Sequence, residues 1–455
     1  MTLLVIAPDY ASHLLPLATF GTAWREAGER VVVASGPATA ALVESFGFER
    51  VDLPLGRGSN PGVMRAGEQP VDETVSLQGF FDATRRGMVP TLAYQARERL
   101  VDLMWQPVQK ARATLAVVDA VRPDHVLVDH LAYSARLALH AGDVPYADVV
   151  LGHPTALPVG GEVYGRPPLW PRAFCPDPAE LDRLDVLCRQ VADGFTAQWN
   201  TATQVLDPGA AAVEDAFALH GPLVLYNYPV ELATPGRALF PHEHLGAALR
   251  EEPVDPQVEA WLRDPAPFAY VSFGTFLSVR GDVLARVVAA LRAAGVRAAV
   301  ARGVTPRNEL GEIPADWLVR EYLPQVRLLR DAAVTVTHGG NNSVTEALAT
   351  ATPLLVLPFS TDQFAGSAAI ERAGVGEALD PNEATVGELR AAVERLLDLR
   401  SPGRDVLTTI GTSQQEDPGP ARAFRAATRR TGPGSDAVTG SPADADRLSV
   451  STVER

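Results

Sequence analysis

Two kinds of segment alternate along this chain. Short continuous apolar runs, such as residues 3–7 and 31–34, have the length and composition of parallel strands buried on both faces. Longer segments of helical length lie between them, such as residues 14–27, which are followed by Gly28, a residue type that favours helix termination. The alternation continues to about residue 400 and predicts an α/β fold with parallel sheets and right-handed crossovers.

The end of the chain departs from this pattern. Thr385 and Glu388 have the spacing of a capping box and predict a helix over residues 385–399. Residues 408–413 read TTIGTS, which is poor helix material, so an irregular segment is expected there. Residues 421–430 fit one short basic helix, and the remaining residues are rich in Gly, Ser, Asp and Pro, which predicts disorder.

A glycine-containing turn follows one of the later strands. The apolar run 332–337 leads into the hexapeptide HGGNNS and then into a segment with helical periodicity. Such a strand, turn and helix N-terminus suits a phosphate, because unpaired N–H groups and the positive end of the helix dipole point at one place. Gly339 and Gly340 allow close approach of the backbone, and Asn342 and Ser343 can cap the helix or contact phosphate oxygens.

This turn belongs to a longer signature. The chain reads YLPQ from residue 322, HGGNNSVTE from 338, PLLVLPF from 353 and DQ at 362–363. The order and spacing resemble the donor-binding signature of family 1 glycosyltransferases, nucleotide-sugar-dependent enzymes that act on macrolides, other polyketides and plant secondary metabolites. Weaker similarity extends over about residues 1–400. The resemblance implies the GT-B architecture, in which two facing Rossmann-like domains with parallel sheets enclose a cleft, with the acceptor in the N-terminal half and the donor in the C-terminal half.

The strand pattern and the resemblance together predict the domain organisation. Members of this family usually end with a helix that returns to brace the first domain. The predicted parts are an N-terminal acceptor-binding domain (1–229), a linker (230–256), a C-terminal nucleotide-sugar-binding domain (257–400), an irregular C-terminal segment (401–430) and a disordered tail (431–455).

A candidate general base lies near the N-terminus. His13 follows the first strand, and an imidazole with a pKa near about 6.5 can accept a proton at neutral pH. Asp129 follows the strand at residues 125–128 and should emerge at the same sheet edge, where a carboxylate can orient the imidazole. Asp124 precedes that strand and should lie at the opposite end. The resemblance gives His13 and Asp129 the catalytic roles, whereas a capping histidine and a helix-capping aspartate are the alternative interpretations.

The resemblance also assigns the donor site. His338, with the turn and helix that follow it, and Thr275 would bind the diphosphate; Tyr322, where relatives commonly have tryptophan, would stack on the base. Gln325 would hydrogen-bond the base or ribose. Glu346 would accept from the ribose hydroxyls, although a first-turn Glu favoured by the helix dipole is an alternative. Asp362 and Gln363 would read the sugar hydroxyls, although Asp362 alone has the position of a helix cap. The predicted donor residues are Thr275, Tyr322, Gln325, His338, Gly339, Gly340, Asn342, Ser343, Glu346, Asp362 and Gln363.

Composition narrows the possible partners. The 455 residues carry a net charge of −15, which argues against nucleic acid or an anionic membrane as a partner. Cys175 and Cys188 have neither metal-like spacing nor a disulfide framework. No leader precedes the first strand, and no apolar run is long enough to cross a bilayer, so a cytoplasmic monomer or homodimer is expected. The resemblance implies that protein donors replace a cation at the diphosphate, so neither metal nor cofactor is expected. An Asp-x-Asp triplet, the motif of metal-using glycosyltransferases, occurs at residues 444–446, but it lies in the predicted tail and is attributed to chance.

The resemblance implies an inverting, metal-independent hexosyltransferase. It would move a hexose or deoxyhexose from a UDP- or dTDP-sugar to a hydroxyl of a small natural product. One alternative is a non-catalytic nucleotide-sugar sensor of the same fold, which the irregular C-terminus and Tyr322 slightly favour. Another is a nucleotide-sugar 2-epimerase, whose acid and base carboxylates the donor signature does not supply.

Overall fold

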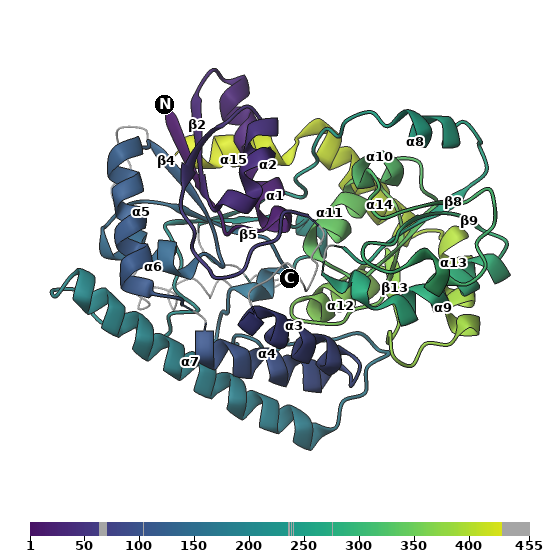
Figure 1. Cartoon of the computed structure of the whole chain (residues 1–455), viewed down its shortest axis with the longest axis horizontal. Coiled ribbons are helices and arrows are strands. Elements are labelled where there is room, and N and C mark those ends of the chain that lie inside the picture. The colour runs from purple at the N-terminus through teal and green to yellow at the C-terminus, as the bar shows by residue number, and fades with distance from the viewer. Residues whose placement is uncertain are drawn as a thin grey trace, which may run out of the picture.

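The computed structural model describes residues 1–62, 71–102, 104–234, 237, 239, 241–274 and 276–429 (Figure 1). Within these residues the strands form two sheets of parallel strands, so the α/β class predicted from the sequence is confirmed. The first sheet has the order β3-β2-β1-β4-β5-β6-β7 and the second the order β10-β9-β8-β11-β12-β13. The predicted disorder of residues 431–455 and the side chain of Thr275 lie outside the described residues.

The first half of the chain builds the seven-stranded sheet and the helices around it. Its strands are β1 (Thr2–Ile6), β2 (Arg30–Ser35), β3 (Glu49–Asp52), β4 (His125–Asp129), β5 (Ala147–Val150), β6 (Leu223–Tyr226) and β7 (His242–His244). Its helices are α1 (Ala11–Glu26), α2 (Ala40–Ser45), α3 (Val71–Thr84), α4 (Met88–Asp102), α5 (Pro107–Val121), α6 (Tyr133–Ala141) and α7 (Pro178–Leu206).

The second half builds the six-stranded sheet. Its strands are β8 (Phe268–Ser272), β9 (Arg297–Ala301), β10 (Leu318–Arg320), β11 (Val334–Thr337), β12 (Leu354–Val356) and β13 (Gly376–Ala378). Its helices are α8 (Pro256–Trp261), α9 (Gly281–Ala293), α10 (Gln325–Leu329), α11 (Asn341–Ala349), α12 (Gln363–Ala373), α13 (Val386–Leu397), α14 (Gly403–Glu416) and α15 (Gly419–Thr428).

Burial on both faces explains why the strand segments are continuous apolar runs. In β1, Leu3 and Val5 join the hydrophobic cluster on one face of the sheet, while Leu4 and Ile6 join the cluster on the other face. All four side chains are fully buried. Because successive side chains in a strand point to opposite faces, a sheet covered by helices on both sides requires apolar residues at every position.

Residues 230–256, predicted as the passage between domains, also contribute to the first sheet. β7 pairs in parallel with β6, and Leu245 and Ala248 lie in the hydrophobic cluster that covers one face of β1. The segment continues to Arg250 and Glu252, which are mostly buried beside the second half of the chain.

The irregular structure expected around residues 408–413 is wrong, whereas the short helix predicted over residues 421–430 is confirmed in its described part. The C-terminal segment forms α14 and α15, and the capping box predicted at the start of α13 is confirmed. In α14, Leu407 and Ile410 are buried in a hydrophobic cluster that contains residues of both halves, so tertiary packing outweighs the weak helix propensity of the intervening threonines. The chain then crosses back to the first half, where α15 packs on α1 (Figure 1). In this contact the ring centroids of Phe424 and Trp24 lie 5.0 Å apart at an interplanar angle of 78°.

Candidate active site

His13 and Asp129 come together at the carboxyl edge of the first sheet. Asp129 is the last residue of β4, and His13 lies in the first turn of α1, directly after the neighbouring strand β1. The His13 Nδ1 atom lies 2.7 Å from Asp129 Oδ2, and the Asp129 side chain is fully buried. The second carboxylate oxygen, Oδ1, accepts a hydrogen bond of 2.8 Å from the backbone N–H of Leu131. Both carboxylate oxygens of Asp129 therefore have hydrogen-bond partners, and the bond to Nδ1 fixes the orientation of the His13 imidazole.

The electrostatics of the pair favour a charged carboxylate beside an imidazole that gains a proton readily. Burial lowers the pKa of His13, but the charge and hydrogen bond of Asp129, with the charge of Asp362, outweigh burial and raise it above its ordinary value. Burial raises the pKa of Asp129, but His13, His130 and the Leu131 N–H outweigh it and lower that pKa. An ionised carboxylate only accepts hydrogen bonds, so Nδ1 of the neutral imidazole carries the proton and Nε2 holds a free lone pair.

Asp124, the other aspartate considered for this role, lies at the opposite edge. Its Oδ2 accepts a hydrogen bond of 2.6 Å from the backbone N–H of Thr2, at the amino end of β1. It therefore stands a full strand length away from His13. The sequence prediction that the two aspartates lie at opposite ends of the strand is confirmed.

His338 lies between two glycines after β11. A Cβ atom at Gly274 would stand 2.7 Å from His338 Cε1, and one at Gly340 would stand 2.3 Å from Nε2. Gly339 has a φ of +85°, which lets the chain turn from the strand into α11. Burial lowers the pKa of His338 to about 4, with a smaller opposing effect from the backbone of Ser272. The side chain is therefore a neutral imidazole at pH 7, able to donate one N–H.

The first turn of α11 reaches across to the first half of the chain. Asn342 Nδ2 donates a hydrogen bond of 2.8 Å to the carbonyl oxygen of Ser12, the residue before His13. The Ser343 hydroxyl donates over 3.4 Å to Gln325 Oε1. Neither side chain caps the helix, since no side-chain cap occurs at this N-terminus. Both predicted phosphate ligands thus have protein partners in this structure.

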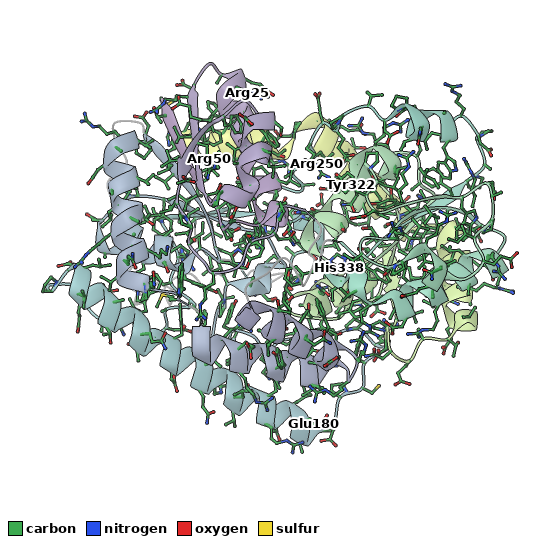
Figure 2. All side chains as sticks on the ribbon, viewed as in Figure 1. Arg25, Arg50, Glu180, Arg250, Tyr322 and His338 are labelled. Carbon is green, nitrogen blue, oxygen red and sulfur yellow. The ribbon has the colours of Figure 1, made fainter. Side chains whose placement is uncertain are left out.

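Gln325 and Glu346, which the sequence assigned to the nucleotide without predicting a contact between them, contact each other and a residue that the sequence did not reveal. Glu346 Oε2 accepts a hydrogen bond of 2.6 Å from Gln325 Nε2, and Oε1 accepts one of 2.6 Å from Arg250. Glu346 is the sixth residue of α11, beyond its first turn, so the helix-dipole interpretation is wrong. Tyr322 is exposed and close enough to Arg250 for its charge to act on the phenol (Figure 2). Arg250 falls in the predicted linker, where no motif marked it.

Asp362 contacts the first half of the chain. Its Oδ2 accepts a hydrogen bond of 2.8 Å from the backbone N–H of His153, and its Oδ1 accepts one of 2.9 Å from the Thr361 hydroxyl. A Cβ atom at Gly152 would lie 2.7 Å from Oδ2, so a glycine there permits the approach. Asp362 stands at the N-cap position of α12 but its side chain caps no N–H of that helix. The capping interpretation is therefore wrong.

Gln363 supports the loop beside it. Its Oε1 accepts hydrogen bonds of 3.0 Å and 3.2 Å from the backbone N–H groups of Phe359 and Ser360. Its side chain is largely buried, yet the residue lines the same cavity as Asp362.

One cavity is lined by most of these residues, although the buried Asp129 behind His13 is not part of its lining. The cavity has a volume of about 1140 Å³ and lies between the two sheets, at the carboxyl ends of their strands. His13 and His130 line it from the first half, and His338, Glu346 and Asp362 line it from the second. The aromatic residues Phe80, Tyr94 and Tyr164 also line it. In parallel α/β sheets, this edge is the place where ligands bind.

The described part of the chain contains no helix with the length and apolar character needed to cross a membrane.

Comparison with known proteins finds glycosyltransferases among the relatives of this chain. Residues 286–426 match the family model described as "Erythromycin biosynthesis protein CIII-like, C-terminal domain". The oleandomycin glycosyltransferase of Streptomyces antibioticus is 40% identical over 99 residues, which cover 22% of this chain and 23% of that protein. The zeaxanthin glucosyltransferase of Pseudescherichia vulneris is 27% identical over 382 residues, 82% of this chain and 84% of that protein. The match to the oleandomycin glycosyltransferase thus covers about a quarter of that protein's length.

Solved structures share the whole architecture. The glycosyltransferase VinC in complex with dTDP superimposes with a TM-score of 0.64 at 19% identity, over 94% of this chain and 100% of that one. At this identity the likeness establishes the fold, two facing α/β domains, for nearly the full length of the chain.

Proposed function

This chain belongs to the family 1 glycosyltransferases of the GT-B fold, and from that membership we propose that it moves a hexose or deoxyhexose from a UDP- or dTDP-sugar to a hydroxyl of a small natural product. The observation that supports this proposal most strongly is that His13, which Asp129 holds from behind, and the His338–α11 turn line one cavity from opposite sheets. A base and a diphosphate site must face each other in this way if one oxygen is to replace another at a sugar carbon.

In the proposed reaction, His13 acts as the general base. Its Nε2 lone pair takes the proton of the acceptor hydroxyl while the acceptor oxygen forms a bond to the anomeric carbon. The bond from that carbon to the diphosphate oxygen breaks on the opposite face, so the configuration inverts. Asp129 stabilises the imidazolium that forms, which agrees with the raised pKa of His13.

The diphosphate that departs needs partners for its growing negative charge. In our proposal His338 donates a hydrogen bond as a neutral imidazole, and the N–H groups at the start of α11 donate from the positive end of the helix dipole. Thr275 and Ser343 would add hydroxyl groups. These donors would serve without a metal ion or a cofactor.

Asp362 and Gln363 would bind the transferred sugar. The charge of Asp362 already acts on His13, so a sugar held by Asp362 would lie close to the base. The aromatic lining residues Phe80, Tyr94 and Tyr164 would contact the acceptor. We further propose that the protein acts in the cytoplasm as a monomer or homodimer, with no nucleic-acid or membrane partner.

Ligand-dependent thermal stabilisation tests the donor site first. We expect UDP, dTDP or their glucose conjugates to raise the melting temperature, because a ligand that binds only the folded state stabilises it, and we expect ADP and NAD to have no effect. The His338→Ala variant should lose the shift. If no nucleotide shifts the wild type, the donor site as described is wrong.

A transfer assay then distinguishes an enzyme from a sensor. Incubation with a donor that binds and a panel of phenolic and polyketide hydroxyl acceptors should release nucleoside diphosphate, and His13→Gln should abolish the release without changing donor affinity. Donor binding with no turnover over a broad acceptor panel would favour the non-catalytic sensor instead.

A further inference from the structure

His130 is a buried histidine beside the proposed catalytic pair, and the proposed reaction does not use it. It directly follows Asp129 at the carboxyl edge of the first sheet, and its side chain is only 3% exposed. Its Nδ1 lies 3.5 Å from Asp129 Oδ1, while His13 Nδ1 lies 2.7 Å from Oδ2 of the same carboxylate. Two imidazoles therefore flank one carboxylate, and both histidines line the cavity between the two sheets.

The end of strand β5 and helix α6 hold His130 in place. Its backbone N–H donates over 3.1 Å to the carbonyl oxygen of Val149, and its own carbonyl oxygen accepts a hydrogen bond of 3.0 Å from Arg136. Its ring Nδ1 accepts one of 3.4 Å from the backbone N–H of Leu151. Three of the four polar atoms of His130 thus have partners on neighbouring elements, and these contacts fix the orientation of the ring.

The fourth polar atom, Nε2, has no hydrogen-bond partner among the residues that the structure describes. An N–H group directed at Nδ1 requires a lone pair there, so the proton of the neutral imidazole lies on Nε2. Burial keeps this imidazole neutral, because it lowers the pKa of His130 to about 4 against the opposing charge of Asp129. Since His130 lines the cavity, its Nε2–H group is the donor that a ligand there can contact.

The place of this donor within the cavity favours the acceptor as its ligand. The groups proposed to bind the donor sugar and its nucleotide all lie in the second half of the chain, from residue 275 onward, whereas His130 belongs to the first. Its neighbours in the lining, Leu131 and Leu151, are apolar, and His13 must contact the reacting hydroxyl itself. Because both imidazoles flank one carboxylate, an acceptor that brings one oxygen to His13 brings its nearest other oxygen toward His130.

We propose that His130 donates a hydrogen bond from Nε2 to a second oxygen of the acceptor, on the carbon next to the one that carries the reacting hydroxyl. The inference rests on the proposed function, since it names the acceptor class of the same active site. Acceptors of this class are vicinal dioxygen compounds, such as catechols. An acceptor without the second oxygen leaves the buried N–H group of His130 without a partner, so it binds more weakly.

Nitrogen NMR of the full chain tests the state of His130 before any ligand is added. Protein labelled with ¹⁵N in its histidine rings should show, at pH 7, a neutral imidazole with the proton on Nε2. The signal is assigned to His130 by its loss in the His130→Gln variant. A proton on Nδ1, or a charged ring, overturns the inference.

The three dihydroxybenzene isomers test the acceptor class. Each isomer carries two equivalent hydroxyl groups, so catechol, resorcinol and hydroquinone differ only in the spacing of their oxygens. With a donor that binds, held at saturation, kcat/KM for catechol should exceed that for either other isomer by about tenfold, mainly through a lower KM.

Amide variants of His130 then test whether this residue sets the preference. The His130→Gln side chain can place an N–H group near the position of Nε2 and should keep most of the catechol preference. The His130→Asn side chain reaches only the position of Nδ1 and should bring the three isomers to within about twofold of one another. His140→Gln is the control, because His140 lies at the end of α6 and outside the cavity lining, and it should leave the ratio unchanged. Donor affinity should equal that of the wild type in all three variants.

The outcomes separate this inference from the proposed function. Equal kcat/KM for the three isomers, or no turnover of any of them, overturns the inference, and the glycosyltransferase proposal is then decided by the donor titration and the broader acceptor panel. A catechol preference that survives in His130→Asn overturns the role of His130. Donor affinity that falls in His130→Asn would place His130 at the transferred sugar and would also overturn the inference.

Discussion

The Asn342 side chain donates a hydrogen bond to the carbonyl oxygen of Ser12 over 2.8 Å, and this bond crosses between the two halves of the molecule. Asn342 lies in the first turn of α11, next to His338, and Ser12 precedes the candidate base His13 in α1. The proposed diphosphate site and the proposed base are therefore placed relative to one another by a direct contact as well as by the packing of their domains.

Replacing Asn342 with alanine should uncouple the two sites. We expect the transfer rate to fall about tenfold, because the base loses its alignment with the bound donor, while donor affinity changes by no more than about twofold. The loss of one partly buried hydrogen bond should lower the free energy of unfolding by only about 1 kcal/mol. Steady-state kinetics and donor titration measure both quantities. A loss of donor affinity as large as the loss of rate would mean that Asn342 binds the phosphate instead.

The pH dependence of transfer should report the His13–Asp129 pair. A base must be neutral to act, so the rate falls as pH drops through the pKa of His13, which Asp129 holds above its ordinary value. Asp129→Asn removes that charge, so the acidic limb of kcat/KM should move to lower pH while the maximal rate falls about a hundredfold. Asp124→Asn, at the far edge of the sheet, serves as the control and should leave the limb unchanged. An acidic limb that stays in place in Asp129→Asn would show that another group titrates.

Gly340→Ala should remove the proposed function of His338 without touching the histidine itself. The new Cβ would lie 2.3 Å from Nε2 and force the ring to move, while the φ of −63° at this position suits any residue. Donor affinity should fall about tenfold, as in His338→Ala, if His338 donates to the diphosphate. Gly366→Ala in α12 is the matched control, because its Cβ would meet nothing within 4 Å. Donor affinity equal to wild type in Gly340→Ala would argue against His338 as a donor.

Residues that follow strands were predictable because the strand pattern fixes which edge they occupy. His13, Asp129 and His338 each follow a continuous apolar run, so parallel topology alone brings them to the carboxyl edges of their sheets. The sequence did not reveal the contacts between the halves. Arg250, His153 and Ser12 meet their partners across about 100 to 330 positions of chain, and two of the three contacts use backbone atoms, which no residue type marks.

In the C-terminal segment, local helix propensity gave the wrong secondary structure. Residues 408–413 contain three threonines, a glycine and a serine, yet they lie within α14. The Thr408 and Thr409 hydroxyls each donate to the carbonyl four residues earlier, so they do not compete for other backbone partners. Leu407 and Ile410 stabilise the helical conformation, because their spacing of three residues places both side chains on the buried side of the helix.

This interpretation of α14 predicts an uneven response to substitution along the helix. Leu407 is fully buried, so Leu407→Ala should lower the free energy of unfolding by about 3 kcal/mol. Thr408→Ala, one position later on the exposed side, should change it by less than about 0.5 kcal/mol, because its hydroxyl bonds only within the helix. Urea denaturation of the two variants makes the comparison. Similar small effects at both positions would mean that the segment is as irregular in solution as its propensities suggest, and that packing against α11 does not hold it.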